Sequence, residues 1–259
     1  MRRIVKIILL ILISSICYCQ DFDNAEKLKG YKNVIVKHCK SYGDWWYSYK
    51  LENGLQVEQR NFSGKIQTLV QEIIYDKNKN ILFEISSFNI NDGFKLDTVS
   101  SYKYKYDELN RLVEKRFVFG MVEKFSDFNE FSKPKRIERF NDNGETLYFW
   151  PISENLEYDA YGNLIKESKI EIDYPESKND TVKKYKLETN FYKYDTYGNI
   201  VEIRRQYPEQ EFPIIMSGGF PLYELEKFRY KYNKEKIWTK KYWIVNGKEM
   251  LIQRRKFEE

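Results

Sequence analysis

Apolar and polar residues alternate along much of the chain with a period of two, the spacing of a β-strand that buries one face. Between residues 102 and 106, a tyrosine occupies every second position and lysines stand between them. The same alternation recurs just before Tyr194. Because successive side chains of a strand point to opposite faces, each run predicts a strand with one aromatic and one charged face. Asn-Gly pairs such as Asn53-Gly54 separate some of these runs and are typical of tight hairpins.

One short motif recurs between the runs: an aromatic residue, Asp or Asn, two variable residues, often glycine, a polar residue and an aliphatic residue. The clearest copies are Tyr158-Asp159 with Gly162, and Tyr194-Asp195 with Gly198. Weaker copies begin at Tyr75, Tyr106, Phe128, Phe140 and Tyr232, and a degenerate copy begins at Arg60. An Asp or Asn side chain can accept hydrogen bonds from the amides that follow it, and glycine can adopt positive φ. The motif therefore predicts a turn, with the aromatic and aliphatic residues facing each other across two strands.

These patterns predict an all-β protein, built as an antiparallel meander of repeated β-hairpins with about a dozen or more strands. We expect an open or partly coiled sheet and no sizeable helical domain. The hairpin repeats are expected to form one domain over residues 50–259. Residues 20–49 form a separate segment, in which residues 24–30 predict a short helical turn and residues 34–39 and 45–49 predict the first strands.

Residues 1–19 predict a secretory signal peptide rather than a part of the fold. Three basic residues precede the apolar run from Ile7 to Ile13, and small residues follow it, so cleavage is expected after Cys19. Lipidation at Cys17 or Cys19 is one alternative, although a bulky residue precedes each of these cysteines. A retained anchor is another, although the apolar run is too short to span a bilayer. We therefore expect an exported protein, located in the periplasm, on the outer surface or in the medium.

The recurring motif resembles the YD repeat of the Rhs and wall-associated protein group, whose signature is Tyr-Asp-x-x-Gly-Asn/Arg-Leu. The resemblance extends from about Arg60 to Trp238. It implies β-sheets of hairpins, which in long members of the group coil into hollow shells around a toxin or present a surface for adhesion or sugar contact. This chain has about eight irregularly spaced units and neither a core-terminating motif nor a toxin segment. What the resemblance implies here is the hairpin architecture and an exported setting, rather than an activity.

Charge and cysteine content narrow the classes of partner. The chain has 44 Lys and Arg against 39 Asp and Glu, and the predicted signal holds three basic residues and no acidic one, so removing it lowers the net charge from +5 to +2. Because basic and acidic residues are interleaved without a basic tail, the sequence argues against nucleic-acid binding. Only Cys39 is left after cleavage, and one thiol cannot form an internal disulfide.

The residues that common catalytic sites need are scarce. The single histidine, His38, excludes a multi-histidine zinc site, and on a strand its side chain would point away from that of Cys39. No phosphate-binding glycine loop or nucleophile elbow is present. The recurrent aspartates are explained by their turns. We therefore expect a non-enzymatic protein without a cofactor or metal site, and the alternative is a glycoside-acting enzyme that uses paired carboxylates.

Five aromatic residues outside the motif are candidate ligand-binding residues because their rings could stack on a sugar. Trp45 and Trp46 begin a predicted strand, Trp150 ends an aromatic run, and Tyr207 and Phe220 lie in the proline- and glycine-rich segment Gln206–Leu222. The alternative, which the pattern favours, is that these rings are core and that the segment plugs the sheet or covers an edge strand rather than forming a binding lip.

Together these observations predict an exported scaffold that binds an unknown protein or glycan partner of the cell envelope. A further alternative is an immunity-type partner of a secreted toxin. The ligand and the oligomeric state are left open by the sequence.

Overall fold

The computed structural model describes residues 25–39, 45–89, 96–117, 120–147, 152–172, 184–208, 210–214 and 221–259. Almost all of this described chain is β-structure, with one short helix, α2 (Ala25–Leu28). In chain order the strands are β1 (Asn33–His38), β2 (Trp45–Glu52), β3 (Leu55–Ser63), β4 (Ile66–Tyr75), β5 (Ile81–Asn89), β6 (Leu96–Tyr106), β7 (Leu112–Phe117), β8 (Val122–Phe128), β9 (Pro134–Phe140), β10 (Ile152–Tyr158), β11 (Leu164–Ile172), β12 (Lys184–Tyr194), β13 (Ile200–Gln206), β14 (Leu225–Tyr232), β15 (Trp238–Val245) and β16 (Lys248–Glu258). The predicted all-β class is confirmed.

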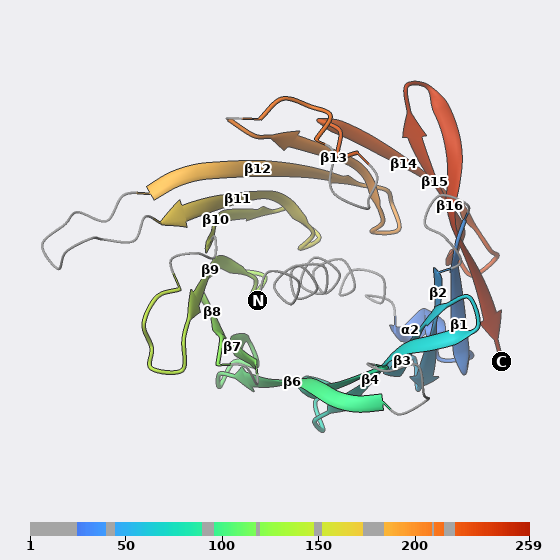
Figure 1. Ribbon diagram of the computed structural model, residues 1–259, viewed down its shortest axis with the longest axis horizontal. Coiled ribbons are helices and arrows are strands. Elements are labelled where there is room, and N and C mark those ends of the chain that lie inside the picture. The colour runs from blue at the N-terminus through green and yellow to red at the C-terminus, as the bar shows by residue number, and fades with distance from the viewer. Residues whose placement is uncertain are drawn as a thin grey trace, which may run out of the picture.

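Each strand pairs in antiparallel fashion with its neighbour along the chain, which confirms the predicted meander. The prediction of an open or partly coiled sheet is wrong, because β1 also pairs with β16 and closes the sixteen strands into a barrel (Figure 1). The seam runs from Asn33 opposite Glu258 to His38 opposite Gln253. Closure has a physical reason: an open sheet would leave two rows of backbone N–H and C=O groups unpaired, whereas the seam satisfies both rows.

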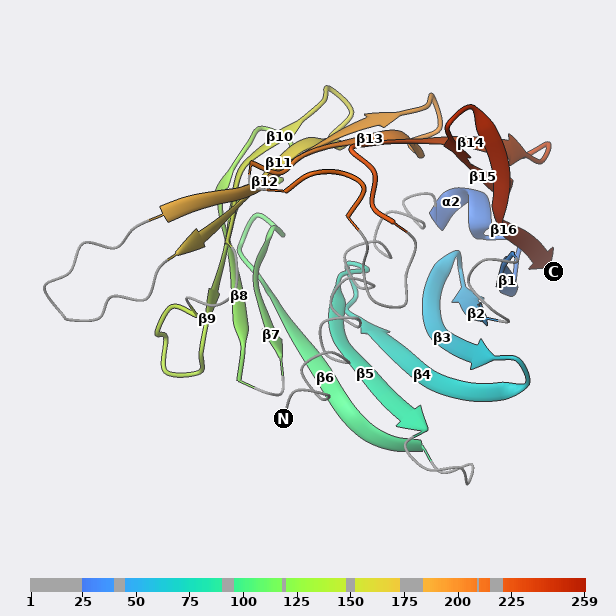
Figure 2. The same cartoon turned by 45° about the horizontal axis from the view of Figure 1, so that its top comes forward.

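Residues from both ends of the chain share one hydrophobic core at this seam. Helix α2 lies on the inner side of the ring, close to β1 and β2 (Figures 1 and 2). The buried cluster consists of Leu28, Val34, Val36, Tyr47, Tyr49, Leu51, Ile237 and Trp238. The expected domain boundary after residue 49 falls inside β2, whose Tyr49 and Leu51 belong to the same cluster.

The motif turns gather at one rim of the barrel. Successive turns of an antiparallel meander alternate between the two rims, so all turns that join an even-numbered strand to the next odd-numbered strand lie on the same side. Six motif turns do so, at residues 76–80, 107–111, 129–133, 159–163, 195–199 and 233–237. We call this side the turn rim. The copy at Phe140 also forms a turn, but at the opposite rim. The copy at Arg60 does not form the motif turn, because Asn61 pairs with Leu69 inside the β3–β4 ladder.

The turn at Asp159 shows how the motif works. The backbone N–H of Gly162 donates to the carbonyl of Asp159 at 3.0 Å, and Gly162 has a φ of +79°, which only glycine adopts without strain. The Asp159 carboxylate accepts hydrogen bonds from the backbone N–H groups of Tyr161 and Asn163, both at 2.9 Å. Tyr158 then pairs with Leu164 across the hairpin. The turn at Asp195 repeats these contacts, with Gly198 at +83° and Tyr194 opposite Ile200.

Tyrosines near the ends of five even-numbered strands, four of them the first residue of a motif copy, also connect each hairpin to the one before it. A tyrosine near the end of an even-numbered strand donates its hydroxyl to a backbone carbonyl at the start of the preceding strand. The donor and acceptor pairs are Tyr75 and Gln56, Tyr106 and Ile81, Tyr158 and Pro134, Tyr194 and Leu164, and Tyr230 and Ile200. Burial and nearby charges raise the pKa of Tyr158 to about 12, so this hydroxyl keeps its proton. The turns are thereby held in register along the rim.

Acid is expected to weaken the turn rim. The Arg111 side chain holds the pKa of Asp107 below its ordinary value of 3.8, and the backbone N–H of Asn80 does the same for Asp76. Burial alone would raise the pKa of Asp159, but hydrogen bonds from Asn163 outweigh it and the net shift is downward. Since these carboxyls have a lower pKa in the folded than in the unfolded chain, their stabilisation is complete above the unfolded pKa and is lost as the pH falls through the folded one.

We expect these carboxyls to leave the melting temperature unchanged between pH 7 and pH 5. Below about pH 4 the melting temperature should fall steeply. Far-UV circular dichroism melts across this range measure it. The control is the triple variant Asp76→Asn, Asp107→Asn, Asp159→Asn, which should be less stable at pH 7 and less sensitive to acid. A triple variant with the unaltered slope would show that the turn carboxyls do not carry the acid response.

Candidate functional site

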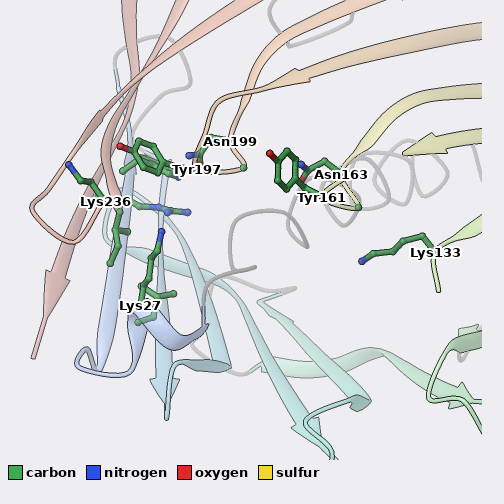
Figure 3. A pocket seen from close by; sticks show the side chains of 13 residues that line it. Lys27, Lys133, Tyr161, Asn163, Tyr197, Asn199 and Lys236 are labelled. Atoms are coloured by element: carbon green, nitrogen blue, oxygen red, sulfur yellow. The ribbon is translucent and has the colours of Figure 1, made fainter. Parts of the chain in front are cut away.

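A pocket of about 380 Å³ opens at the turn rim (Figure 3). Four consecutive motif turns contribute to its lining, those at residues 129–133, 159–163, 195–199 and 233–237. Helix α2 adds Lys27 and Leu28, and β16 adds Arg255. The meander places neighbouring turns side by side, so residues that are about 100 positions apart in the sequence line one cavity.

The floor of the pocket is apolar and rigid. Leu28, Ile237 and Trp238 line it, and each exposes less than a tenth of its surface. The Arg255 guanidinium lies over the Trp238 ring, with 3.6 Å between the guanidinium carbon and the ring centroid. A cation over an indole face is attracted by the ring quadrupole, so this contact fixes both side chains. The floor is therefore part of the hydrophobic core rather than a mobile surface.

Two tyrosines at the same position of neighbouring turns form the wall. Tyr161 is the third residue of its turn and is 91% exposed, whereas the equivalent Tyr197 is half-buried. The Tyr197 ring lies 4.7 Å from the Tyr232 ring and 5.7 Å from the Lys27 amine. Tyr197 is thus held in place by its neighbours, while the ring of Tyr161 is available on both faces.

The amides and carboxylates beside the wall are used by the turns themselves. The Asn163 side-chain amide donates to Asp159 at 2.8 Å, and the Asn199 amide donates to the Tyr232 hydroxyl at 3.0 Å. That hydroxyl in turn donates to Asp195. Burial and the Asp195 contact raise the pKa of Tyr232, so it stays a neutral donor. The carboxylates near the pocket are therefore oriented into their turns.

The charged residues that line the pocket are all cations: Lys27, Lys133, Lys236 and Arg255. Lys133 lies close to the neighbouring turn. A Cβ atom placed on Gly162 would lie 3.7 Å from the Cε atom of Lys133. Within the described ranges, the amines of the three lysines take part in no ion pair with an acidic side chain. The pocket therefore has a positive potential that attracts anions.

The aromatic residues predicted as ligand contacts do not come together here. Trp45 is 49% exposed but lies at the rim opposite the turn rim. The adjacent Trp46 stacks on Phe62 with 3.8 Å between ring centroids and donates its indole N–H to the Gly64 carbonyl at 2.8 Å. These contacts give Trp46 a structural role.

Tyr207 is also removed from the turn rim. It is half-buried beside Phe212, and burial and a hydrogen bond with Glu188 raise its pKa. Trp150 and Phe220 lie outside the described residues. The expectation that these five residues contact a ligand stays a prediction.

The sequence pattern predicts only a structural role for the motif residues, yet Gly162 and Gly198 line the pocket. The pocket tyrosines, Tyr161 and Tyr197, occupy one of the two variable positions of the motif. Two neighbouring copies carry the same residue type at this position, and this repetition is the feature of the sequence that points to them.

Among the residues that the structure describes, no three His, Cys, Asp or Glu side chains gather in a way that could hold a metal ion. The described helix is too short to cross a membrane.

The fold and the pocket define an all-β protein of repeated hairpins, closed into an antiparallel barrel with a cationic, tyrosine-lined cavity at one rim. No family model and no curated protein matches the sequence. Among solved structures, the chain is similar to the TcdB2-TccC3-Cdc42 crystal structure, with a TM-score of 0.33 and 14% identity over 80% of this chain and 10% of that one. It is also similar to a porin-like protein from Bacteroides uniformis ATCC 8492, with a TM-score of 0.39 and 10% identity over 88% and 98% of the two chains. The chain spans about a tenth of the length of the first of these proteins.

Proposed function

We propose that this protein is an exported, non-enzymatic scaffold whose turn-rim pocket binds a glycan. The observation that carries the proposal is the pair Tyr161 and Tyr197, set at equivalent turn positions above the buried floor of a 380 Å³ pocket. Cavities of a few hundred Å³ are typical of small-ligand sites. Export rests on the signal-like pattern of residues 1–19.

A sugar ring suits this wall for two reasons. The C–H groups on one face of a pyranose pack against an aromatic ring, and Tyr161 presents a ring that is 91% exposed. The polar edge of the sugar needs hydrogen-bonding groups at the side of the stack, and Asn163 and Asn199 line the pocket beside the two tyrosines. Hydrogen bonds hold the two side-chain amides in place, which reduces the ordering cost of binding.

The chemistry of the nearby carboxylates favours binding over turnover. A glycosidase needs one carboxyl that is protonated at working pH to act as a general acid. Asp159 is a poor candidate because its hydrogen bonds hold its pKa below the ordinary value, against the effect of burial. Asp195 accepts hydrogen bonds from its own turn and from Tyr232. Both carboxylates are therefore committed to the fold.

A glycan array followed by titration of any hit tests the proposal, with tryptophan fluorescence as the readout because Trp238 lies in the pocket floor. Tyr161→Ala is expected to weaken binding about fivefold, the loss of one stacking contact. The matched control is Leu109→Ala, which removes an exposed side chain at the same position of another motif turn. Absence of any glycan ligand, or equal effects of the two substitutions, would contradict the proposal.

A further inference from the structure

The pocket is positively charged, and binding of a neutral glycan gives no reason for that charge. Lysines on the strands of this barrel are commonly neutralised across the ladder, as in Lys105 with Glu114 at 2.9 Å and Lys193 with Glu202 at 2.8 Å. The pocket lysines depart from this pattern, since the lining includes four cations and no acidic residue. Within the described ranges the amines of Lys27, Lys133 and Lys236 form no ion pair with an acidic side chain, and like charges held close together repel one another, so the arrangement favours an anionic occupant.

The cations surround the stacking wall rather than lying to one side of it. In Figure 3, Lys133 lies on one side of Tyr161, while Lys27 and Lys236 lie on the other side, near Tyr197. They come from separate elements: α2, the turn after β8 and the turn after β14. Arg255 is 9% exposed and packs on Trp238, which makes it a buried part of the floor. The three lysines are therefore the groups that a ligand reaches.

We infer that the pocket takes an acidic saccharide, a sugar ring that carries a carboxylate or a sulfate. The ring packs on Tyr161, and anionic groups to either side of it accept charge-assisted hydrogen bonds, from Lys133 on one side and from Lys27 and Lys236 on the other. This inference rests on the proposed glycan-binding function and specifies the class of glycan. A bare inorganic anion would leave the tyrosines without a role, and a nucleic acid would need a basic surface that extends beyond the pocket.

Matched pairs of oligosaccharides test the inference. The probes are a linear uronate-containing and a linear sulfated oligosaccharide, each compared by calorimetry with the neutral oligosaccharide of the same backbone. The full chain is expected to bind at least one acidic probe at least about tenfold more tightly than its neutral counterpart, since each hydrogen bond to a charged group contributes about that factor. This preference should shrink as NaCl is raised, because exposed charges are screened.

Substitutions of single lysines identify the residues that cause the preference for the acidic probe. Lys133→Gln and Lys236→Gln are each expected to weaken binding of the acidic probe about tenfold, and to weaken binding of the neutral probe by a smaller factor. The matched control is Lys79→Gln. Lys79 and Lys236 occupy the fourth position of their turns with φ of +67° and +62°, so the two substitutions carry the same backbone cost, and Lys79 lies outside the pocket.

The outcomes separate this inference from the function on which it rests. Equal affinity for acidic and neutral probes, with a loss in Tyr161→Ala, would overturn the inference and leave glycan binding in place. Binding of none of the probes or array glycans would overturn both. If inorganic sulfate or a single-stranded oligonucleotide of equal charge competes as well as the acidic saccharide, the site recognises charge alone and the inference fails.

Discussion

Replacing Trp238 with alanine is expected to lower the free energy of unfolding by about 3–5 kcal/mol, the range for removing a large aromatic side chain from a packed interior. Trp238 is 3% exposed and belongs to the cluster that joins both ends of the chain. Its ring lies 5.8 Å from that of Tyr230 and directly beneath the Arg255 guanidinium. The substitution therefore leaves a cavity and also leaves a buried cation without its aromatic partner.

The control is Trp45→Ala, which removes the same side chain from a position that is 49% exposed. Its expected cost is about 1 kcal/mol, since about half of the Trp45 surface is already in contact with water. Urea unfolding followed by far-UV circular dichroism gives both free energies from the same type of curve. Equal losses in the two variants would show that Trp238 is not a core residue.

The turns can be predicted from the sequence because the residues that cause each turn lie close together in the chain. The turn at Asp159 depends on a carboxylate that bonds amides two and four residues later, and on a glycine at positive φ. All of these residues lie within one copy of the motif. The cross-strand pair of Tyr158 and Leu164 follows from the turn, since a hairpin fixes the register of its strands.

Closure of the barrel could not be predicted in the same way. The seam pairs Val36 with Arg255, two residues from opposite ends of the chain that no turn connects. The alternation of apolar and polar residues predicts which face of each strand is buried, but it does not predict which strands become neighbours. The hydroxyl contacts that hold successive hairpins, such as Tyr194 to the Leu164 carbonyl, depend on the strand spacing and are equally absent from local patterns.

The candidate site was missed for a related reason. The tryptophans are predicted ligand contacts because their rings could stack on a sugar, yet Trp46 is engaged with Phe62 and Gly64. The pocket residues Tyr161 and Tyr197 sit at a motif position that the turn geometry does not constrain. They acquire a common role only because the meander places every second turn at one rim, which is a property of the topology rather than of the motif.

Val36→Pro is expected to remove at least 3 kcal/mol of stability and to make the protein associate. Val36 is fully buried in the middle of β1, opposite Arg255 on one side and Tyr47 on the other. Proline has no N–H to donate and does not fit a strand that is paired on both sides. The substitution separates β1 from its partners and exposes strand edges to other molecules. Urea unfolding together with light scattering after size-exclusion chromatography measures both effects.

The matched control is Lys77→Pro, at the second position of the turn at residues 76–80, where the fixed φ of proline suits a common turn. It should leave stability within about 1 kcal/mol of the original protein. A large loss in Val36→Pro with little change in Lys77→Pro would show that β1 is a buried, paired strand. Equal effects of the two substitutions would contradict this placement of Val36.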